Sequence, residues 1–156
     1  MNDKIRVLLS EEEVAKRIKE MGEVISSDYE GRPLHLICIL KGGVFFTCEL
    51  AKRISLPLTL DFMSVSSYGA GTVSSGIVKI VKDLDEPIEG KDVLIVEDII
   101  DSGNTLSYLI EVLKQRNPRS IELCTLLDKP ERRVKKQVTV KYTSVSYTHL
   151  RAHETG

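Results

Sequence analysis

Hydrophobic residues follow two alternating patterns along the chain. Short apolar runs rich in β-branched residues indicate buried strands, and apolar positions three or four residues apart indicate amphipathic helices. Strands are predicted over residues 34–40, 56–68, 77–84, 91–100 and 120–127. Helices are predicted over residues 10–29, 44–54 and 104–115. Strands alternating with helices predict an α/β fold with a mostly parallel, twisted sheet flanked by helices.

Local signals support several of these boundaries. Ser10 and Glu13 have the spacing of a capping box, which marks a helix N-terminus. Asn117-Pro118 is typical of a helix end. Residues 91–100 form the most continuous apolar run, as expected of a central parallel strand. Residues 69–76 (GAGTVSSG) have no apolar period, and we expect a flexible loop there.

Composition and charge limit the class of protein but do not indicate a function. With 156 residues, of which 42% are hydrophobic and 29% charged, the chain is typical of one folded domain and not of a disordered protein. A net charge of −1 gives no general attraction to nucleic acid or anionic membranes, so neither is expected as a partner. No apolar run approaches the roughly 20 residues that cross a bilayer, and no signal peptide is recognisable, so we expect a cytoplasmic protein.

The cysteines and histidines indicate neither disulfides nor metal ligands. Each of the three cysteines lies in an apolar run, and none forms a C-x-x-C pair, so buried free thiols are expected. The three histidines are unclustered in the sequence, and we assign no metal to them.

Ligands of parallel α/β sheets bind at the carboxyl ends of the strands. This rule directs attention to Lys41-Gly42-Gly43, to the segment after Glu97-Asp98, and to Asp128-Lys129. The second of these is the most informative. A buried strand ends in adjacent carboxylates, and a loop of small residues with backbone and hydroxyl donors then opens a helix.

This arrangement favours a sugar phosphate as the ligand. Backbone N–H groups, the hydroxyls of Ser102 and Thr105, and the helix dipole attract a phosphate, whereas adjacent carboxylates suit sugar hydroxyls or Mg²⁺. Plainer interpretations remain open, with Asp101 as a helix cap and Glu97-Asp98 as a solvated strand end. Neither G-x-x-x-x-G-K-[ST] nor a G-x-G-x-x-G after the first strand is present, which argues against a P-loop or dinucleotide fold.

The chain resembles the type I phosphoribosyltransferases, and in particular the hypoxanthine (hypoxanthine-guanine) phosphoribosyltransferases. The segment 96–105 (VEDIIDSGNT) is similar to the motif of that family for 5-phosphoribosyl pyrophosphate (PRPP). Other matching segments follow the family order: Leu40-Lys41-Gly42-Gly43, Ser67-Tyr68-Gly69 and Leu126-Leu127-Asp128-Lys129-Pro130. The resemblance extends from about residue 4 to Thr143. It implies the type I phosphoribosyltransferase fold, with a flexible lid loop.

The resemblance also implies a reaction, in which ribose 5-phosphate passes from PRPP to N9 of a 6-oxopurine and pyrophosphate leaves. Mg²⁺ is the implied cofactor, and a homodimer or homotetramer is the implied assembly. An unusual cis peptide is expected between Leu40 and Lys41.

The family motifs assign a role to each matching residue. Glu97 and Asp98 would hold the ribose hydroxyls, directly or through Mg²⁺, and Asp101 would be the general base near purine N7. Lys41 and Gly42 would contact pyrophosphate. The 5-phosphate cradle would be formed by Asp101, Ser102, Gly103, Asn104 and Thr105. The lid loop would contain Ser67 and Tyr68, and Lys129 would contact the purine 6-oxo group.

The resemblance ends near Thr143. The family continues with a segment that stacks on the purine, reads its edge and supplies an aspartate for a second Mg²⁺, whereas this chain ends SVSYTHLRAHETG. We therefore predict a phosphoribosyltransferase domain over residues 1–143 that lacks the C-terminal hood segment, followed by a non-native tail over residues 144–156. Such a chain is expected to bind PRPP weakly and to turn over poorly or not at all. The preference between hypoxanthine and guanine stays open.

A regulator that shares the fold, senses nucleotides and binds RNA is the alternative. Glu97 beside Asp98, in place of a pair of aspartates, and Lys129 in its Leu-Leu-Asp-Lys context favour purine salvage. A basic cluster is the feature on which RNA binding would depend, although a solvated, charged loop and edge strand is the favoured explanation. Its members are Lys129, Arg132, Arg133, Lys135, Lys136 and Lys141. Arg133 is set apart from them because a basic residue near that position lies close to the site in the family.

Overall fold

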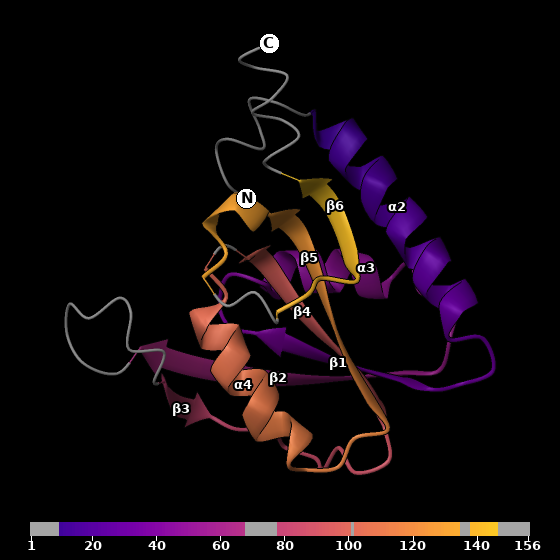
Figure 1. Cartoon of the computed structure of the whole chain (residues 1–156). Helices are drawn as coiled ribbons and strands as arrows, with labels where there is room; N and C mark the ends of the chain where they lie inside the picture. Colours follow the sequence, from indigo (N-terminus) through magenta and orange to yellow (C-terminus); the bar gives the residue numbers. More distant parts are fainter. Residues whose placement is uncertain (1–9, 68–77, 101, 135–137, 147–156) are drawn as a thin grey trace.

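The computed structural model of the chain describes residues 10–67, 78–100, 102–134 and 138–146 (Figure 1). Helices and strands follow the order that the sequence predicts, with alternation in the first and last parts of the described chain and three successive strands in the middle. In chain order they are α2 (Glu11–Asp28), β1 (Leu34–Ile39), α3 (Val44–Ala51), β2 (Leu58–Ser67), β3 (Val78–Lys82), β4 (Asp92–Ile100), α4 (Asn104–Lys114), β5 (Ser120–Asp128), the 3₁₀ turn η1 (Pro130–Arg132) and β6 (Tyr142–Ser146).

The described strands form a six-stranded sheet in the order β3-β2-β1-β4-β5-β6. Strands β2, β1, β4, β5 and β6 run parallel to their neighbours in that order, whereas β3 pairs antiparallel with β2. The predicted mostly parallel sheet is therefore confirmed. The chain first adds β2 on one side of β1 and later adds β4 on the other, so the topological switch point lies between β1 and β4.

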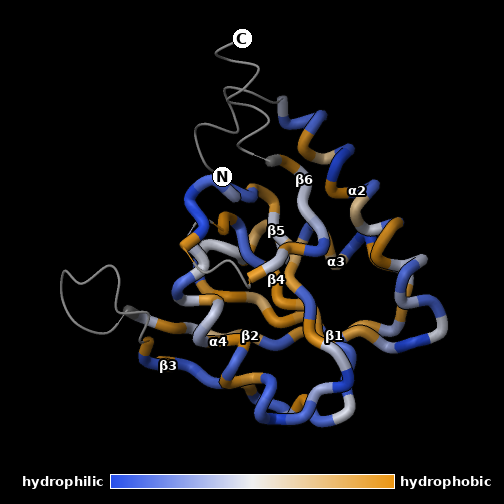
Figure 2. The backbone as a smooth tube through the Cα atoms, viewed as in Figure 1, coloured by the Kyte–Doolittle hydropathy of each residue, from blue (hydrophilic) through white to orange (hydrophobic). Residues whose placement is uncertain are grey.

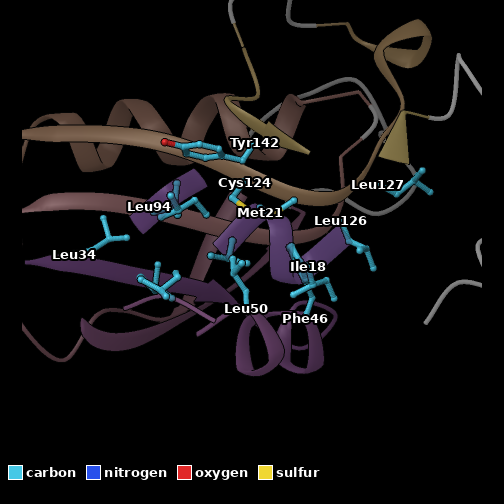
Figure 3. Close-up of a cluster of buried hydrophobic side chains, with 14 of the residues drawn as sticks. Ile18, Met21, Leu34, Phe46, Leu50, Leu94, Cys124, Leu126, Leu127 and Tyr142 are labelled. Atoms are coloured by element: carbon cyan, nitrogen blue, oxygen red, sulfur yellow. Dashed lines mark hydrogen bonds between the residues drawn. The ribbon is translucent and has the colours of Figure 1, made fainter. Parts of the chain in front are cut away.

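Alternate strand residues face opposite layers of helices. One core lies between the sheet and α2 and α3, and its members include Ile18, Leu34, Leu50 and Leu94 (Figure 3). A second core lies on the α4 side of the sheet. The hydropathy colouring shows apolar strands at the centre and polar turns around them (Figure 2). Strand β4, the predicted central strand, is fully buried from Asp92 to Val96.

Helix α2 begins and ends close to the predicted boundaries. The Ser10 side chain accepts a hydrogen bond from the backbone N–H of Glu13 at 3.1 Å, which confirms the predicted cap. Helix α3 stops at Ala51, earlier than predicted. Its last turn tightens, because the N–H groups of Arg53 and Ile54 donate to carbonyls three residues back, at Leu50 and Ala51.

Two regions bear on the remaining predictions. The predicted flexible loop over residues 69–76 lies outside the described residues. Strand β6, which the sequence patterns did not predict, extends to Ser146 and so includes residues assigned to the tail. Val145 is 3% exposed and pairs with Leu127 of β5, so its burial accounts for the extension. Among the described helices, none is long and apolar enough to cross a membrane.

Polar side chains are buried at the amino ends of the strands, away from the carboxyl ends. His35 on β1 and Asp61 on β2 are each 2% exposed, and His35 Nδ1 lies 2.6 Å from Thr59 Oγ1. Burial raises the pKa of Asp61, but backbone N–H donors from Phe62, Asp85 and Glu86 outweigh it and lower the pKa overall. Burial, followed by the charge of Lys91, lowers the pKa of His35 below its ordinary value.

We expect His35 to make the fold sensitive to mild acid. Because its pKa is lower in the folded than in the unfolded state, the unfolded chain binds more protons below about pH 6.5, and stability falls as the pH drops through that value. Denaturant unfolding at pH 7.5 and 5.5 should show a loss of about 1 kcal/mol in the natural chain. The loss should be clearly smaller in His35→Gln. Equal losses of stability in the two proteins would contradict the attribution of the acid sensitivity to His35.

Candidate active site

The carboxyl ends of the parallel strands gather the predicted site residues at one edge of the sheet. Lys41 and Gly42 follow β1, Glu97 and Asp98 lie in the last part of β4, and Lys129 follows β5. The loops after β1 and β4 flank the topological switch point, where ligands of open parallel sheets bind. The structure therefore places these segments at the strand ends, and the roles assigned to their residues stay predictions.

The loop after β1 is tightly held at its base. The peptide bond between Leu40 and Lys41 is cis, as expected from the resemblance. Gly43 lies directly over the strand ends, because a Cβ at this position would be 3.1 Å from the carbonyl oxygen of Ile39 and 3.2 Å from that of Val96. Lys41 and Gly42 are exposed, so the loop offers a cation and a bare backbone at the site.

The carboxylates of β4 are half-buried. Burial raises the pKa of Asp98 above its ordinary value. Asp98 lines a pocket together with Gly42 and the apolar side chains of Phe45 and Leu126, which is the environment that disfavours its charge. Thr125 fixes the backbone here, because its hydroxyl donates to the carbonyl oxygen of Asp98 at 3.0 Å. A carboxylate in this position gains from hydroxyl donors or a cation brought by a ligand.

The loop between β4 and α4 has the geometry of a phosphate cradle. Gly103 adopts the left-handed conformation, with φ of 80°, immediately before the first residue of α4. The Asn104 N–H donates to Ser102 Oγ at 3.3 Å, which folds the loop back on itself. The helix N-terminus and its positive dipole end therefore face the end of β4, where an anion is favoured. Asp101, the predicted general base, lies outside the described residues.

The segment after β5 lies over this loop. The Lys129 N–H donates to the Ile100 carbonyl at 2.8 Å, and the Val134 N–H donates to the Ser102 carbonyl at 2.8 Å. Between these anchors, Arg133 forms an ion pair with Asp128, and their side chains are 7% and 15% exposed. Of the basic cluster, Arg133 thus has a side chain largely shielded from solvent, while Arg132 beside it is exposed.

The Asp128–Arg133 pair was not predicted. The signal available in the sequence was an aspartate at a strand end followed five residues later by arginine, a spacing that no periodicity singles out. Of the predicted lid residues, Ser67 is the last residue of β2, and Tyr68 lies outside the described residues. The cradle residues Ser102 to Thr105 are brought together, with Asn104 and Thr105 in the first turn of α4.

The donor set at the end of β4 fits Mg²⁺. This cation prefers carboxylate oxygens and is commonly held by one or two of them together with substrate phosphates, rather than by a protein cage. Glu97 and Asp98 supply such oxygens in the last part of β4, the strand that leads into the loop before α4. Within the described residues, no group of three or more His, Cys, Asp or Glu side chains could hold a metal alone.

Comparison with known sequences identifies related proteins. The profile of the "Phosphoribosyl transferase domain" matches residues 6–152. A hypoxanthine-guanine phosphoribosyltransferase of Bacillus subtilis is 54% identical over 128 residues, which are 82% of this chain and 71% of that protein. The bifunctional protein TilS/HprT of Listeria innocua is 55% identical over 129 residues, or 83% of this chain. The chain spans only 20% of the length of that bifunctional relative.

Solved structures agree with the sequence matches. A crystal structure of a hypoxanthine-guanine phosphoribosyltransferase from Bacillus anthracis superposes with a TM-score of 0.85 at 43% identity. The match covers 88% of this chain and 81% of that one. The chain therefore shares its fold with a hypoxanthine-guanine phosphoribosyltransferase of known structure.

Proposed function

Because the chain belongs to the phosphoribosyl transferase family, we propose that it acts in purine salvage as a hypoxanthine (or hypoxanthine-guanine) phosphoribosyltransferase. The reaction transfers the 5-phosphoribosyl group of PRPP to N9 of hypoxanthine or guanine and gives IMP or GMP and pyrophosphate. The observation that carries the proposal is the phosphate cradle at Ser102–Thr105, directly after the carboxylates of β4 and beneath the segment that begins at Lys129.

Each end of PRPP meets residues of suitable chemistry. The 5-phosphate takes the backbone N–H groups and hydroxyls of the loop from Asp101 to Thr105, at the positive end of α4. Glu97 and Asp98 accept hydrogen bonds from the ribose hydroxyls. Lys41 and Gly42 contact the pyrophosphate, where the exposed ammonium group offsets negative charge. These contacts orient C1 of the ribose toward the purine.

On the purine side, Lys129 donates a hydrogen bond to the 6-oxo group, and Asp101 accepts the purine proton near N7. The bond from C1 to the pyrophosphate oxygen breaks, the bond from C1 to N9 forms, and positive charge develops on the ribose meanwhile. Nearby carboxylates stabilise that charge, and a lid formed by Ser67 and Tyr68 keeps water from the reacting carbon.

Mg²⁺ is the proposed cofactor, held by Glu97 and Asp98. When bound, it supplies positive charge that offsets the charge of the departing pyrophosphate. A cytoplasmic location and a homodimer or homotetramer are proposed from the family relationship, with PRPP and a 6-oxopurine as the small-molecule substrates. We also propose that residues 1–143 belong to the phosphoribosyltransferase domain.

Calorimetric titration with PRPP tests the function directly. The purified chain is titrated with and without Mg²⁺, and hypoxanthine or guanine is then added while IMP or GMP is followed by chromatography. PRPP binding that requires Mg²⁺, with any purine nucleotide formed in step with loss of PRPP, is the expected result. A chain that unfolds cooperatively on heating but binds no PRPP would contradict the proposal and would turn attention to an RNA-binding regulator.

A further inference from the structure

The ion pair between Asp128 and Arg133 lies next to two parts of the proposed site, the segment that begins at Lys129 and the loop between β4 and α4. Asp128 ends β5, and Arg133 follows the η1 turn. The pair closes a short loop that contains Lys129, the residue proposed to contact the purine. With side chains 7% and 15% exposed, both charges are largely withdrawn from water. Such a pair holds its geometry firmly, because removing one partner leaves the other charge buried.

The arginine also contacts the phosphate cradle. A Cβ on Gly103 would lie 3.1 Å from Arg133 Cδ, so the aliphatic part of the arginine side chain rests against this glycine. The neighbouring Val134 N–H donates to the Ser102 carbonyl at 2.8 Å. Glycine suits this position for two reasons: it adopts the left-handed backbone conformation without strain, and it has no side chain that would push Arg133 away.

We propose that Arg133, held by Asp128, is a positioning residue that couples the purine side of the site to the 5-phosphate cradle. This inference rests on the proposed function. A ligand phosphate that orders Ser102 and Gly103 also orders Arg133 and, through the closed loop, Lys129. Whichever ligand binds first then orders both the cradle and the loop that contains Lys129, so the second ligand binds without that free-energy cost. Each ligand therefore tightens the binding of the other by the same factor.

The first test needs no ligand. Amide hydrogen exchange of Val134 reports the contact with Ser102 directly. In Arg133→Met, which keeps the aliphatic stem but loses the guanidinium, exchange at Val134 should rise by about tenfold or more. Arg132→Met is the matched control, since it removes an equal charge from the exposed neighbour. Equal exchange rates in the two variants would overturn the proposed contact.

The second test measures the coupling itself. The dissociation constant of hypoxanthine is determined by calorimetry without and with saturating ribose 5-phosphate, which fills the phosphate cradle without reacting. The unsubstituted chain and Arg132→Met should bind hypoxanthine at least about fivefold more tightly when ribose 5-phosphate is present. In Arg133→Met this factor should fall toward one, and Arg133→Lys should restore part of it.

Asp128→Asn combined with Arg133→Met guards against a folding artefact, because it leaves neither charge buried alone. This double variant should remain folded and still lack the coupling. If the unsubstituted chain binds neither ligand, the proposed function fails, and the coupling falls with it. The coupling alone is refuted by any of three results: the chain binds ribose 5-phosphate but not hypoxanthine even when both are present, it binds both ligands but the factor is one, or the factor survives in Arg133→Met.

Discussion

Replacing Asp98 and Asp101 together with alanine is expected to abolish Mg²⁺-dependent PRPP binding. Asp98 lies half-buried in a pocket with Gly42, and burial raises its pKa, so its charge is stabilised chiefly by what a ligand brings. Hydrogen bonds to charged groups contribute about 1.5–3 kcal/mol each, and the loss of both carboxylates should weaken binding by roughly a hundredfold or more. Calorimetric titration with PRPP and Mg²⁺ measures the change.

The matched control for this double variant is Glu111→Ala. Glu111 is 66% exposed on α4 and pairs only loosely with Lys114, at 3.8 Å. The substitution therefore removes a carboxylate without altering the site. PRPP affinity should be unchanged in this control. A double variant that binds PRPP as tightly as the control does, and with the same dependence on Mg²⁺, would refute the assignment of the β4 carboxylates.

Gly22→Ala is expected to destabilise the fold by about 1–3 kcal/mol, although alanine favours helices. Gly22 lies within α2 and faces the residues that follow α3. A Cβ at this position would lie 2.5 Å from Arg53 Cβ and 2.6 Å from the Arg53 carbonyl oxygen. Because one neighbour is backbone, the clash cannot be relieved by a rotamer change, and α2 must move away from α3.

Ser27→Ala separates helix propensity from the clash. Ser27 is an exposed residue of the same helix, so this change gains propensity without meeting a neighbour. Denaturant unfolding should show Ser27→Ala as stable as the natural chain or slightly more so, and Gly22→Ala as clearly less stable. If Gly22→Ala is the more stable of the two variants, the inferred clash between an alanine side chain at this position and Arg53 is wrong.

Most of the fold could be predicted from local patterns. Residues 93–96 are apolar throughout, and a strand so composed is stable only where both faces are covered, which places it in the middle of the sheet. The capping pair Ser10 and Glu13 likewise fixed the start of α2. Strand β6 was missed because its burial depends on Val145 pairing with β5, and nothing within residues 142–146 signals that partner.

The site could be predicted in the same way where its residues are close in sequence. Glu97, Asp98 and the segment from Ser102 to Thr105 occupy one strand–loop–helix unit, so their spacing alone brings carboxylates and phosphate donors together. The roles of Asp101 and Tyr68 stay predictions from the family resemblance. The placement of Lys41 and Lys129 beside this unit followed from a rule of parallel sheets and not from local spacing.

The sequence by itself determined the succession of strands and helices along the chain, the mostly parallel sheet, and the strand–loop–helix unit that holds Glu97, Asp98 and residues 102–105, because each depends on local patterns of residues. Tertiary structure alone decided that His35 is buried beside Asp61, that Gly22 touches Arg53, and that Arg133 rests on Gly103. The physical reason is that burial and close contact depend on which distant segments the sheet places side by side. The residues next to a side chain in the sequence do not indicate which distant residue it will contact.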